Sequence, residues 1–231
     1  EVWFYPREMT LDAYRTVFKN KDIVIGYLNT IFYAVFGTLF SLAMTLTAAY
    51  ALSKRHFIGR NVIMFFFAFT MYFGGGMIAS YLNIKNLGLL NTRWVMIIPT
   101  AISTYNLIVC RTFFANGIPS EVEEAAIIDG CSRPRMFFSI VLPLMKPALF
   151  SAGLFQFLWT YNDYFNSLIF INSVKKYTIS LALRLSVDAE SVVVWGRVMA
   201  MACVAVLPLV LLFFAAQKNF VEGIATSGLK G

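Results

Sequence analysis

The stretch YLNTIFYAVFGTLFSLAMTLTAAYAL, residues 27–52, contains no charged residue and decides the fold class of this chain. A helix needs about 20 residues to cross the ~30 Å hydrocarbon core of a bilayer, because each residue adds ~1.5 Å. The stretch is therefore long enough to span a membrane. Its apolar residues run on without regular polar alternation, which favours a helix over a strand of a membrane barrel.

The composition of the whole chain agrees with this interpretation. Of the 231 residues, 59% are hydrophobic, only 13% are charged, and 23 are Phe. An ordinary soluble domain does not need so much apolar surface. Further apolar runs predict membrane helices at residues 62–81, 95–114, 148–171 and 193–217. We therefore expect an all-α integral membrane protein, a polytopic bundle of five membrane helices that forms one domain over residues 1–231.

A motif lies between the third and fourth predicted helices. It consists of Glu124-Ala125-Ala126, three residues, Gly130, nine residues, Ile140, one residue and Leu142-Pro143. This pattern resembles the EAA loop (Glu-Ala-Ala, x3, Gly, x9, Ile-x-Leu-Pro) of the membrane subunits of binding-protein-dependent ABC importers, and every fixed position is matched. The resemblance implies that residues 116–147 form a cytoplasmic loop that contacts an ATPase subunit.

The first part of this loop predicts a short helix. Ser120 is expected to be its N-cap, with acidic residues in the first turn, and Gly130 is expected to end it in the left-handed conformation. The resemblance implies a coupling helix that docks into a cleft of the ATPase subunit. The contact residues that it implies are Glu124, Ala125, Ala126, Asp129, Gly130, Leu142 and Pro143. The alternative is an ordinary amphipathic surface helix, and we interpret Glu121 and Glu123 individually as solvated first-turn acids.

The resemblance extends from about Phe4 to Gly231 and is to the smaller permease subunit of maltose-type, carbohydrate uptake importers. Family members carry one more membrane helix ahead of a segment like residues 4–14, so a sixth, N-terminal helix is expected before the printed sequence. A genuine five-helix protein is the alternative. Residues 87–92 and 162–166 also resemble the branch that handles larger oligosaccharides, including acidic ones such as alginate fragments.

Two further segments carry site predictions. The Gly-rich residues 218–231 are similar to the cytoplasmic tail of the smaller maltose-type subunit, which implies that Gly223, Gly228 and Lys230 contact the ATPase subunits; a disordered tail is the alternative. The fourth predicted helix is unusually polar, and polar groups within a membrane demand partners. Its candidates for the translocation path are Gln156, Tyr161, Asn162 and Asp163. For Asp163, a structural hydrogen bond at a helix end is an equal alternative.

Glycines interrupt the second predicted helix at residues 74–76, where we expect a break in the helix. The basic residues Lys54, Arg55 and Arg60 crowd one short loop, which is typical of a cytoplasmic turn. The net charge of +7 is therefore interpreted as membrane topology and lipid contact, with no role in nucleic-acid binding. The three cysteines and His56 lack the spacing of metal ligands, so neither a metal site nor a catalytic site is expected.

The resemblance implies an assembly in the bacterial cytoplasmic (inner) membrane. Its partners are a homologous second permease subunit, two ATP-binding cassette subunits and an extracytoplasmic solute-binding protein. The printed sequence has no Gly-x4-Gly-Lys-Ser/Thr loop, so we expect ATP and Mg on the ATPase subunits and no cofactor on this chain. The alternatives are an importer of a non-sugar solute, a secondary transporter, or a membrane scaffold without transport.

Overall fold

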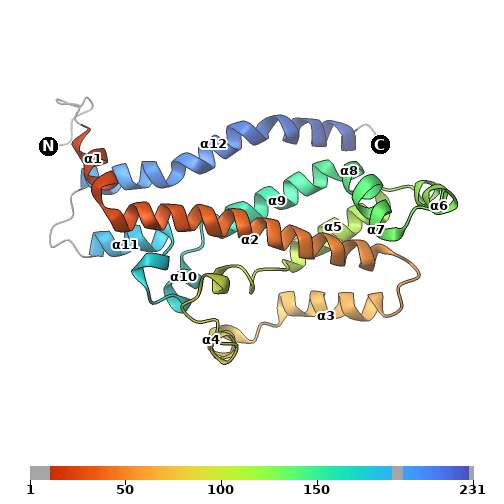
Figure 1. The fold of residues 1–231 in the computed structure, drawn as a ribbon, viewed down its shortest axis with the longest axis horizontal. Coiled ribbons are helices and arrows are strands. Elements are labelled where there is room, and N and C mark those ends of the chain that lie inside the picture. The colour runs from red at the N-terminus through yellow and green to blue at the C-terminus, as the bar shows by residue number, and fades with distance from the viewer. Residues whose placement is uncertain (1–10, 189–194, 229–231) are drawn as a thin grey trace.

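The computed structural model describes residues 11–188 and 195–228, and every regular element in these two ranges is helical (Figure 1). The longer helices are α1 (Asp12–Lys19), α2 (Lys21–Ser53), α3 (Arg60–Tyr72), α4 (Gly76–Asn86), α5 (Thr104–Asn116), α6 (Ser120–Ile128), α9 (Lys146–Tyr161), α11 (Ile179–Asp188) and α12 (Trp195–Gly228). Shorter turns are η1 (Arg93–Met96), α7 (Arg133–Met136), the π-helix η2 (Phe137–Val141), α8 (Leu142–Leu144), α10 (Phe165–Phe170) and η3 (Val174–Lys176). The prediction of an all-α protein is confirmed for these residues.

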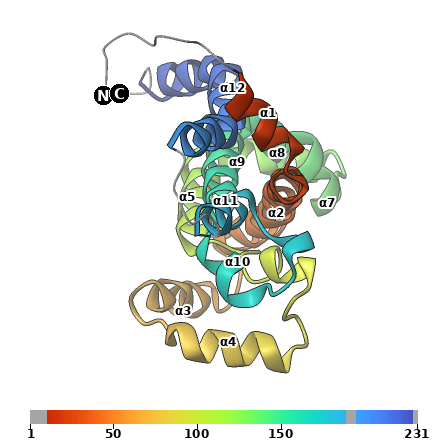
Figure 2. The same ribbon diagram turned by 90° about the vertical axis from the view of Figure 1, so that its left-hand side faces the viewer.

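Helix α2 packs along its length against α5, α9 and α11 (Figure 2). It begins where the Asn20 side chain accepts a hydrogen bond of 3.0 Å from the backbone N–H of Asp22. Its 33 residues correspond to a length of about 50 Å. A single helix therefore runs from one end of the bundle to the other.

The side chains of α2 are distributed in the opposite way to those of a soluble helix. Its buried positions include small or polar residues such as Gly26, Thr30 and Ser41, whereas large apolar residues such as Phe36 and Leu39 are exposed. Small residues let helices approach closely where lipid supplies no hydrophobic driving force between them. An apolar exterior around a partly polar interior is the arrangement expected of a membrane protein.

Two of the five predicted spans are long continuous helices. Helix α2 covers the predicted span 27–52, and residues Trp195–Ala215 of α12 are long and apolar enough to cross a membrane. Two more spans are obtained only if each of two bent helix pairs is counted as one. The predicted number of five membrane helices is therefore not confirmed by the residues that the structure describes.

The predicted span 62–81 is broken at the glycines. Helix α3 ends at Tyr72, α4 begins at Gly76 with a φ of 80°, and the two helices are bent by 119°. A positive φ strains any side chain with a Cβ but not glycine. The predicted interruption at residues 74–76 is confirmed.

The predicted spans 95–114 and 148–171 are shorter in the structure. Residues 97–103 are not helical, and α5 begins only at Thr104, after Ser103 caps it. Helix α9 begins with Pro147 in its first turn and ends at Tyr161; after a break at residues 162–164 the chain forms α10. Hydropathy alone did not reveal these breaks, because apolar loops packed against the bundle have the composition of helices.

The last helix is longer than predicted. Helix α12 begins at Trp195 and continues through Gly228, with Pro208 inside it. The predicted tail therefore starts as a continuation of this helix and not as an extended segment. Residues 189–194 and 229–231, which include Val193 and Lys230, lie outside the described residues.

Two apolar clusters mark the two ends of the bundle. One contains Leu52, Phe114 and Ala126, and it joins the end of α2 to α5 and α6. The other contains Tyr33, Ile84 and Phe170, and it joins α2 to α4 and α10. We call these regions the α6 end and the α10 end; they lie at the right and left of Figure 1.

Candidate coupling helix and translocation cavity

Helix α6 carries the Glu-Ala-Ala motif and ends as predicted, although it begins differently. The N-cap is Pro119, without a side-chain cap, so the prediction that Ser120 would cap the helix is wrong. At the other end Gly130 has a φ of 72°, and the N–H of Cys131 donates to the carbonyl of Ala126 at 2.9 Å. These are the features of a Schellman turn, which glycine favours. The predicted left-handed Gly130 is confirmed.

The two sides of α6 differ in burial. Ala126 is only 5% exposed and packs into the apolar cluster of the α6 end, so it does not lie on a surface open to a partner. Its predicted contact with an ATPase subunit stays a prediction. In contrast, Glu124 and Ala125 are exposed, and Ile127 and Ile128 are 59% and 85% exposed. The two isoleucines were not among the predicted contact residues.

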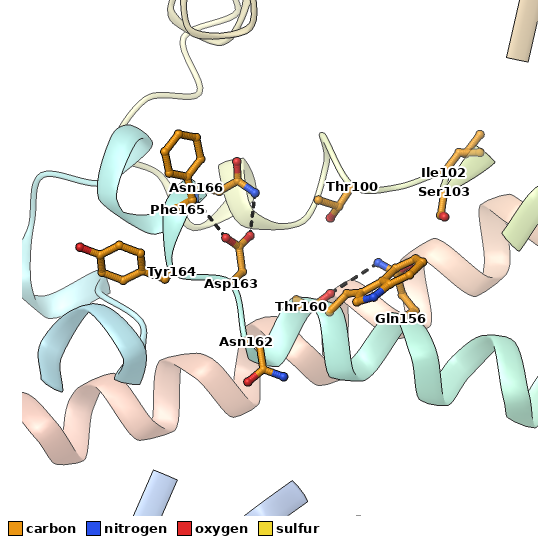
Figure 3. A pocket seen from close by; sticks show the side chains of 11 residues that line it. Thr100, Ile102, Ser103, Gln156, Thr160, Asn162, Asp163, Tyr164, Phe165 and Asn166 are labelled. Carbon is orange, nitrogen blue, oxygen red and sulfur yellow. Dashed lines mark hydrogen bonds between the residues drawn. The ribbon is translucent and has the colours of Figure 1, made fainter. Parts of the chain in front are cut away.

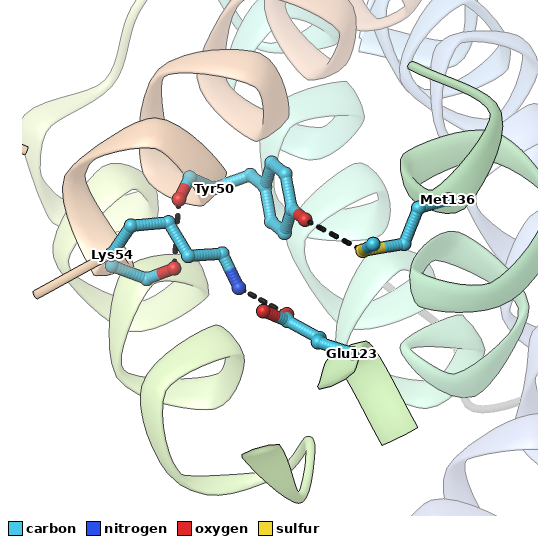
Figure 4. Close-up of polar contacts among 5 residues, drawn as sticks. Tyr50, Lys54, Glu123 and Met136 are labelled. Atoms are coloured by element: carbon cyan, nitrogen blue, oxygen red, sulfur yellow. Dashed lines mark hydrogen bonds and ion pairs between the residues drawn. The ribbon is translucent and has the colours of Figure 1, made fainter. Parts of the chain in front are cut away.

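Glu123 is not the solvated acid that the sequence suggested. Its carboxylate forms an ion pair with the ammonium of Lys54, and the two side chains are only 20% and 30% exposed (Figure 4). The Lys54 Nζ also lies 4.2 Å from the centroid of the Tyr50 ring. A first-turn acid on α6 is thereby connected to the last turn of α2, a contact between residues that are far apart in sequence.

The remaining motif residues lie on either side of this contact. Asp129 is the exposed C-cap of α6. Leu142 is half-buried against the same apolar cluster, whereas Pro143 is exposed in α8. Pro143 has no N–H for the carbonyl of Ser139, and its ring crowds that carbonyl, which accounts for the wide π-helical turn η2 just before it.

A cavity of about 560 Å³ contains three of the four predicted path residues (Figure 3). It is lined by residues that include Thr100, Ser103, Gln156, Trp159, Asn162 and Asp163. Tyr161 does not line it. Its ring is buried, and its hydroxyl donates a hydrogen bond of 2.7 Å to the Ala205 carbonyl of α12, so it joins α9 to α12.

Most polar groups around the cavity already have partners in the chain. The Asp163 carboxylate accepts hydrogen bonds from the Asn166 backbone N–H at 3.0 Å and from the Asn166 side chain at 2.7 Å. It therefore caps the first turn of α10, as the structural alternative proposed. The Asn162 amide is exposed, donates to the Leu158 carbonyl at 2.9 Å, and points away from Asp163 in Figure 3.

Gln156 belongs to a buried polar row that the sequence did not identify. Its carbonyl oxygen lies 3.5 Å from the Asn106 amide nitrogen of α5, and its own amide lies 3.4 Å from the Thr160 hydroxyl. All three residues are at most 5% exposed. Unpaired polar groups are costly inside an apolar bundle, so these contacts hold Gln156 at the edge of the cavity.

The loops at the α10 end are also held together by polar contacts. Asn29 of α2 donates to the carbonyls of Lys175 and Tyr177 at 2.9 and 3.2 Å, and the Tyr33 hydroxyl donates to the Lys176 carbonyl at 2.9 Å. The Lys176 ammonium in turn contacts the carbonyl of Asn91. Loops far apart in sequence are thus tied to the start of α2.

These loops are basic. Residues 76–103 and 164–178 contain Lys85, Arg93, Lys175 and Lys176 and no Asp or Glu. Lys85 and Lys175 are exposed, whereas Arg93 donates to Asn29 at 3.3 Å and lies 5.4 Å from the Phe32 ring. We call these four residues the basic rim.

The predicted contacts of the tail are placed only in part. Gly223 and Gly228 lie within α12, and Lys230 lies outside the described residues.

Comparison with known proteins identifies the family. Residues 37–226 match the family described as binding-protein-dependent transport system inner membrane component. Protein LplC of Bacillus subtilis is 37% identical over 99% of this chain and 82% of its own length. The polygalacturonan/rhamnogalacturonan transport system permease protein YtcP of the same organism is 38% identical over 98% of this chain and 84% of its own.

A solved structure has the same fold. It is a chain in the crystal structure of a bacterial ABC transporter involved in the import of the acidic polysaccharide alginate. The TM-score is 0.89 at 32% identity, and the match covers 95% of this chain and 83% of that chain. The chain described here therefore belongs to the inner membrane components of binding-protein-dependent transport systems, as the motif between its third and fourth predicted spans indicated.

Proposed function

We propose that this chain is the permease subunit of an ABC importer for an acidic oligosaccharide, and that it is coupled to its ATPase through α6. The observation that carries the coupling assignment is the division of α6 into two sides. Glu123 and Ala126 are held by the bundle, whereas Glu124, Ala125 and Ile128 project from it. A helix that exposes apolar side chains next to small ones at the end of a bundle is suited to a partner groove.

The chemistry of ATP hydrolysis is assigned to the partner subunits. ATP and Mg are held there, and this chain contributes no catalytic group. Its part is mechanical: a displacement of the ATPase subunits moves α6, and the bundle changes its arrangement in response. The α6 end accordingly faces the cytoplasm, which agrees with the basic residues Lys54, Arg55 and Arg60 close to it.

The assembly comprises a homologous second permease subunit, two ATPase subunits and an extracytoplasmic solute-binding protein. The exposed apolar faces of α3 and α12 are consistent with contacts to a second permease subunit and to surrounding lipid. Helix α3 has no buried residue, and only 11% of the spanning window of α12 is buried. A large apolar face of this kind requires lipid or another protein to cover it.

The substrate class rests on the relatives and on charge. YtcP is named for polygalacturonan and rhamnogalacturonan transport, and the alginate transporter for an acidic polysaccharide. In this chain the α10 end, which faces away from the ATPase, carries the basic rim of Lys85, Arg93, Lys175 and Lys176 without an acid in the same segments. Such a rim raises the local concentration of an anionic substrate. The cavity beside Gln156 and Asn162 forms part of the translocation path.

The proposal is tested with the whole transporter, purified in mild detergent through a tag on this chain and reconstituted in vesicles with its solute-binding protein. Trigalacturonic acid and maltotriose serve as acidic and neutral probes. We expect ATP-dependent uptake of the acidic probe that falls as ionic strength rises. Uptake of maltotriose without uptake of trigalacturonic acid would contradict the proposal of an acidic substrate. A tagged complex that contains no ATPase would contradict the coupling assignment.

A further inference from the structure

Four side chains connect the last turn of α2 to α6 and α7 at the α6 end. They are Tyr50 in the last turn of α2, Lys54 at the C-cap of α2, Glu123 of α6 and Met136 of α7 (Figure 4). We call this group the α2–α6 joint. None of its members belongs to the predicted contact with the ATPase, and each faces the interior of the bundle or a neighbour in the joint.

The charges of the joint are placed where they interact strongly. The ammonium of Lys54 pairs with the carboxylate of Glu123 and lies over the Tyr50 ring at 4.2 Å from its centroid. Both charged side chains are largely removed from solvent, and an ion pair is screened less in such surroundings than at the surface. An ammonium over an aromatic face gains a further attraction.

Aromatic packing fixes the α2 side of the joint. The Tyr50 hydroxyl lies 3.6 Å from the sulfur of Met136, and the Tyr50 ring lies 5.0 and 5.6 Å from the rings of Phe137 and Phe114. The Arg111 guanidinium of α5 also donates to the Leu52 carbonyl at 3.1 Å. The end of α2 is therefore held by α5 and α7 as well as by α6.

The α6 side of the joint is the buried side of that helix. Glu123 and Ala126 are three residues apart and so lie on the same face. Ala126 packs into the apolar cluster that contains Leu52, one turn from the ion pair. The motif residues that project outward, Glu124 and Ala125, are left for the partner.

We propose that the Lys54–Glu123 pair is a positioning contact that makes α6 and α2 move as one body when the ATPase subunits displace α6. The inference rests on the proposed coupling function and adds the route by which the displacement enters the bundle. Because α2 is an unbroken helix of 33 residues, motion at its end reaches Asn29 and Tyr33, which bind the backbone of the η3 loop. The joint thus links the ATPase contact to the basic rim.

The first test is an exchange of the two charges. Lys54→Glu and Glu123→Lys are each expected to lower the trigalacturonate transported per ATP hydrolysed by roughly fivefold or more, a typical size for coupling between sites. The double variant is expected to recover most of the loss. Arg55→Glu and Glu121→Lys, which place the same charges at exposed neighbouring positions, are matched controls and should remain near wild type.

The second test does not require the substrate or a charge reversal. Spin labels are placed at exposed Leu39 of α2 and Glu121 of α6, with the native cysteines replaced, and distances are measured with and without ATP and vanadate. In the otherwise wild-type complex the distance should change by less than ~2 Å, the size of a small helix shift. With Glu123→Gln it should change more or become broader on trapping.

The outcomes separate this proposal from the one that it rests on. The proposed role of the joint is wrong if α6 moves relative to α2 in the otherwise wild-type complex. It is also wrong if the double charge exchange restores no transport per ATP while Glu123→Gln leaves the spin-label distances unchanged. Glu124→Lys on the outward side tests the ATPase contact independently. A loss of ATPase association in that variant together with such results would keep the coupling helix and discard only the joint.

Discussion

The α6 end and the cavity end of α9 both carry polar residues within an apolar bundle. Most of these residues are exposed on α6, whereas around the cavity most form hydrogen bonds within the chain. On α6, Glu124 is exposed beside Ile127 and Ile128, so polar and apolar groups project together from the fold. Around the cavity, Asp163 is engaged by Asn166, and Gln156 by Asn106. A group that the fold itself satisfies has little left to offer a partner, whereas an exposed one retains its capacity to bind.

This difference ranks the two regions as sites. At the α6 end the side chains of Glu124, Ala125 and Ile128 are exposed in the described fold, which favours a role in assembly. At the cavity end, hydrogen bonds within the chain already account for the polar groups of Asp163 and Tyr161. Among the four predicted path residues, Asn162 alone is both exposed and at the cavity wall, and it is the better candidate for a contact with the substrate.

The largest effect is expected from Gly130→Val. A β-branched residue at a φ of 72° is strained by about 1–3 kcal/mol, and relief of that strain would undo the turn that ends α6. We expect uptake to fall at least tenfold while the protein still inserts in the membrane. Gly88→Val is the matched control, since Gly88 has a φ of 68° and equally open surroundings but lies at the α10 end. Equal losses in both variants would mean that strain alone is responsible.

A smaller effect is expected from Glu124→Lys on the exposed side of α6. Reversal of an exposed charge at a docking surface should weaken association with the ATPase by about 1 kcal/mol, roughly fivefold. The amount of ATPase that co-purifies with the tagged chain measures this directly. Glu121→Lys makes the same change in the first turn of the helix. Wild-type association of the Glu124 variant would show that this side is not the contact.

The cavity end is tested by a pair of variants at Asp163. Because the carboxylate caps α10, Asp163→Ala should cost about 1 kcal/mol, whereas Asp163→Asn keeps an acceptor and should be close to neutral. Thermal unfolding of the purified complex distinguishes them. A stable Asn variant with strongly reduced uptake would instead assign the charge to the translocation path.

Asn162→Ala provides the comparison within the same cavity. Loss of one hydrogen bond to the substrate, about 0.5–1.5 kcal/mol, should reduce uptake roughly two- to tenfold. Assembly and ATPase stimulation should persist, because the hydrogen bond that this amide donates to the Leu158 carbonyl is local to α9. Unchanged uptake would remove Asn162 from the path.

The smallest effect is expected from deletion of residues 223–231. Since α12 continues through Gly228, the deletion shortens a helix, and we predict about a twofold lower yield of associated ATPase. Co-purification measures this yield, with deletion of 229–231 alone as the control. Unchanged yield and uptake in the longer deletion would leave the tail without a role in docking.

The features that could be predicted from the sequence are those fixed by local chemistry. The apolar run of α2, the glycine break before α4 and the left-handed Gly130 each follow from residues close together in the chain. The Lys54–Glu123 pair could not be predicted, since its members are far apart in sequence and meet only through packing. The hydrogen bond from the Tyr161 hydroxyl to the Ala205 carbonyl could not be predicted for the same reason, so the sequence placed Tyr161 in the path.

The small residues along the buried side of α2 also determine which mutations this protein tolerates. A Cβ added at Gly26 would lie 3.1 Å from the Cβ of Ala182 and 3.3 Å from the Thr178 carbonyl, and one added at Gly153 would lie 3.2 Å from a methyl group of Leu42. Enlarging Gly26 therefore displaces the backbone of Thr178 and the start of α11 by a few tenths of an ångström, whereas shortening exposed Phe36 or Leu39 removes only outward-facing surface. In natural variation of this chain, added methyl groups inside the bundle should be rarer than methyl groups lost from its exterior.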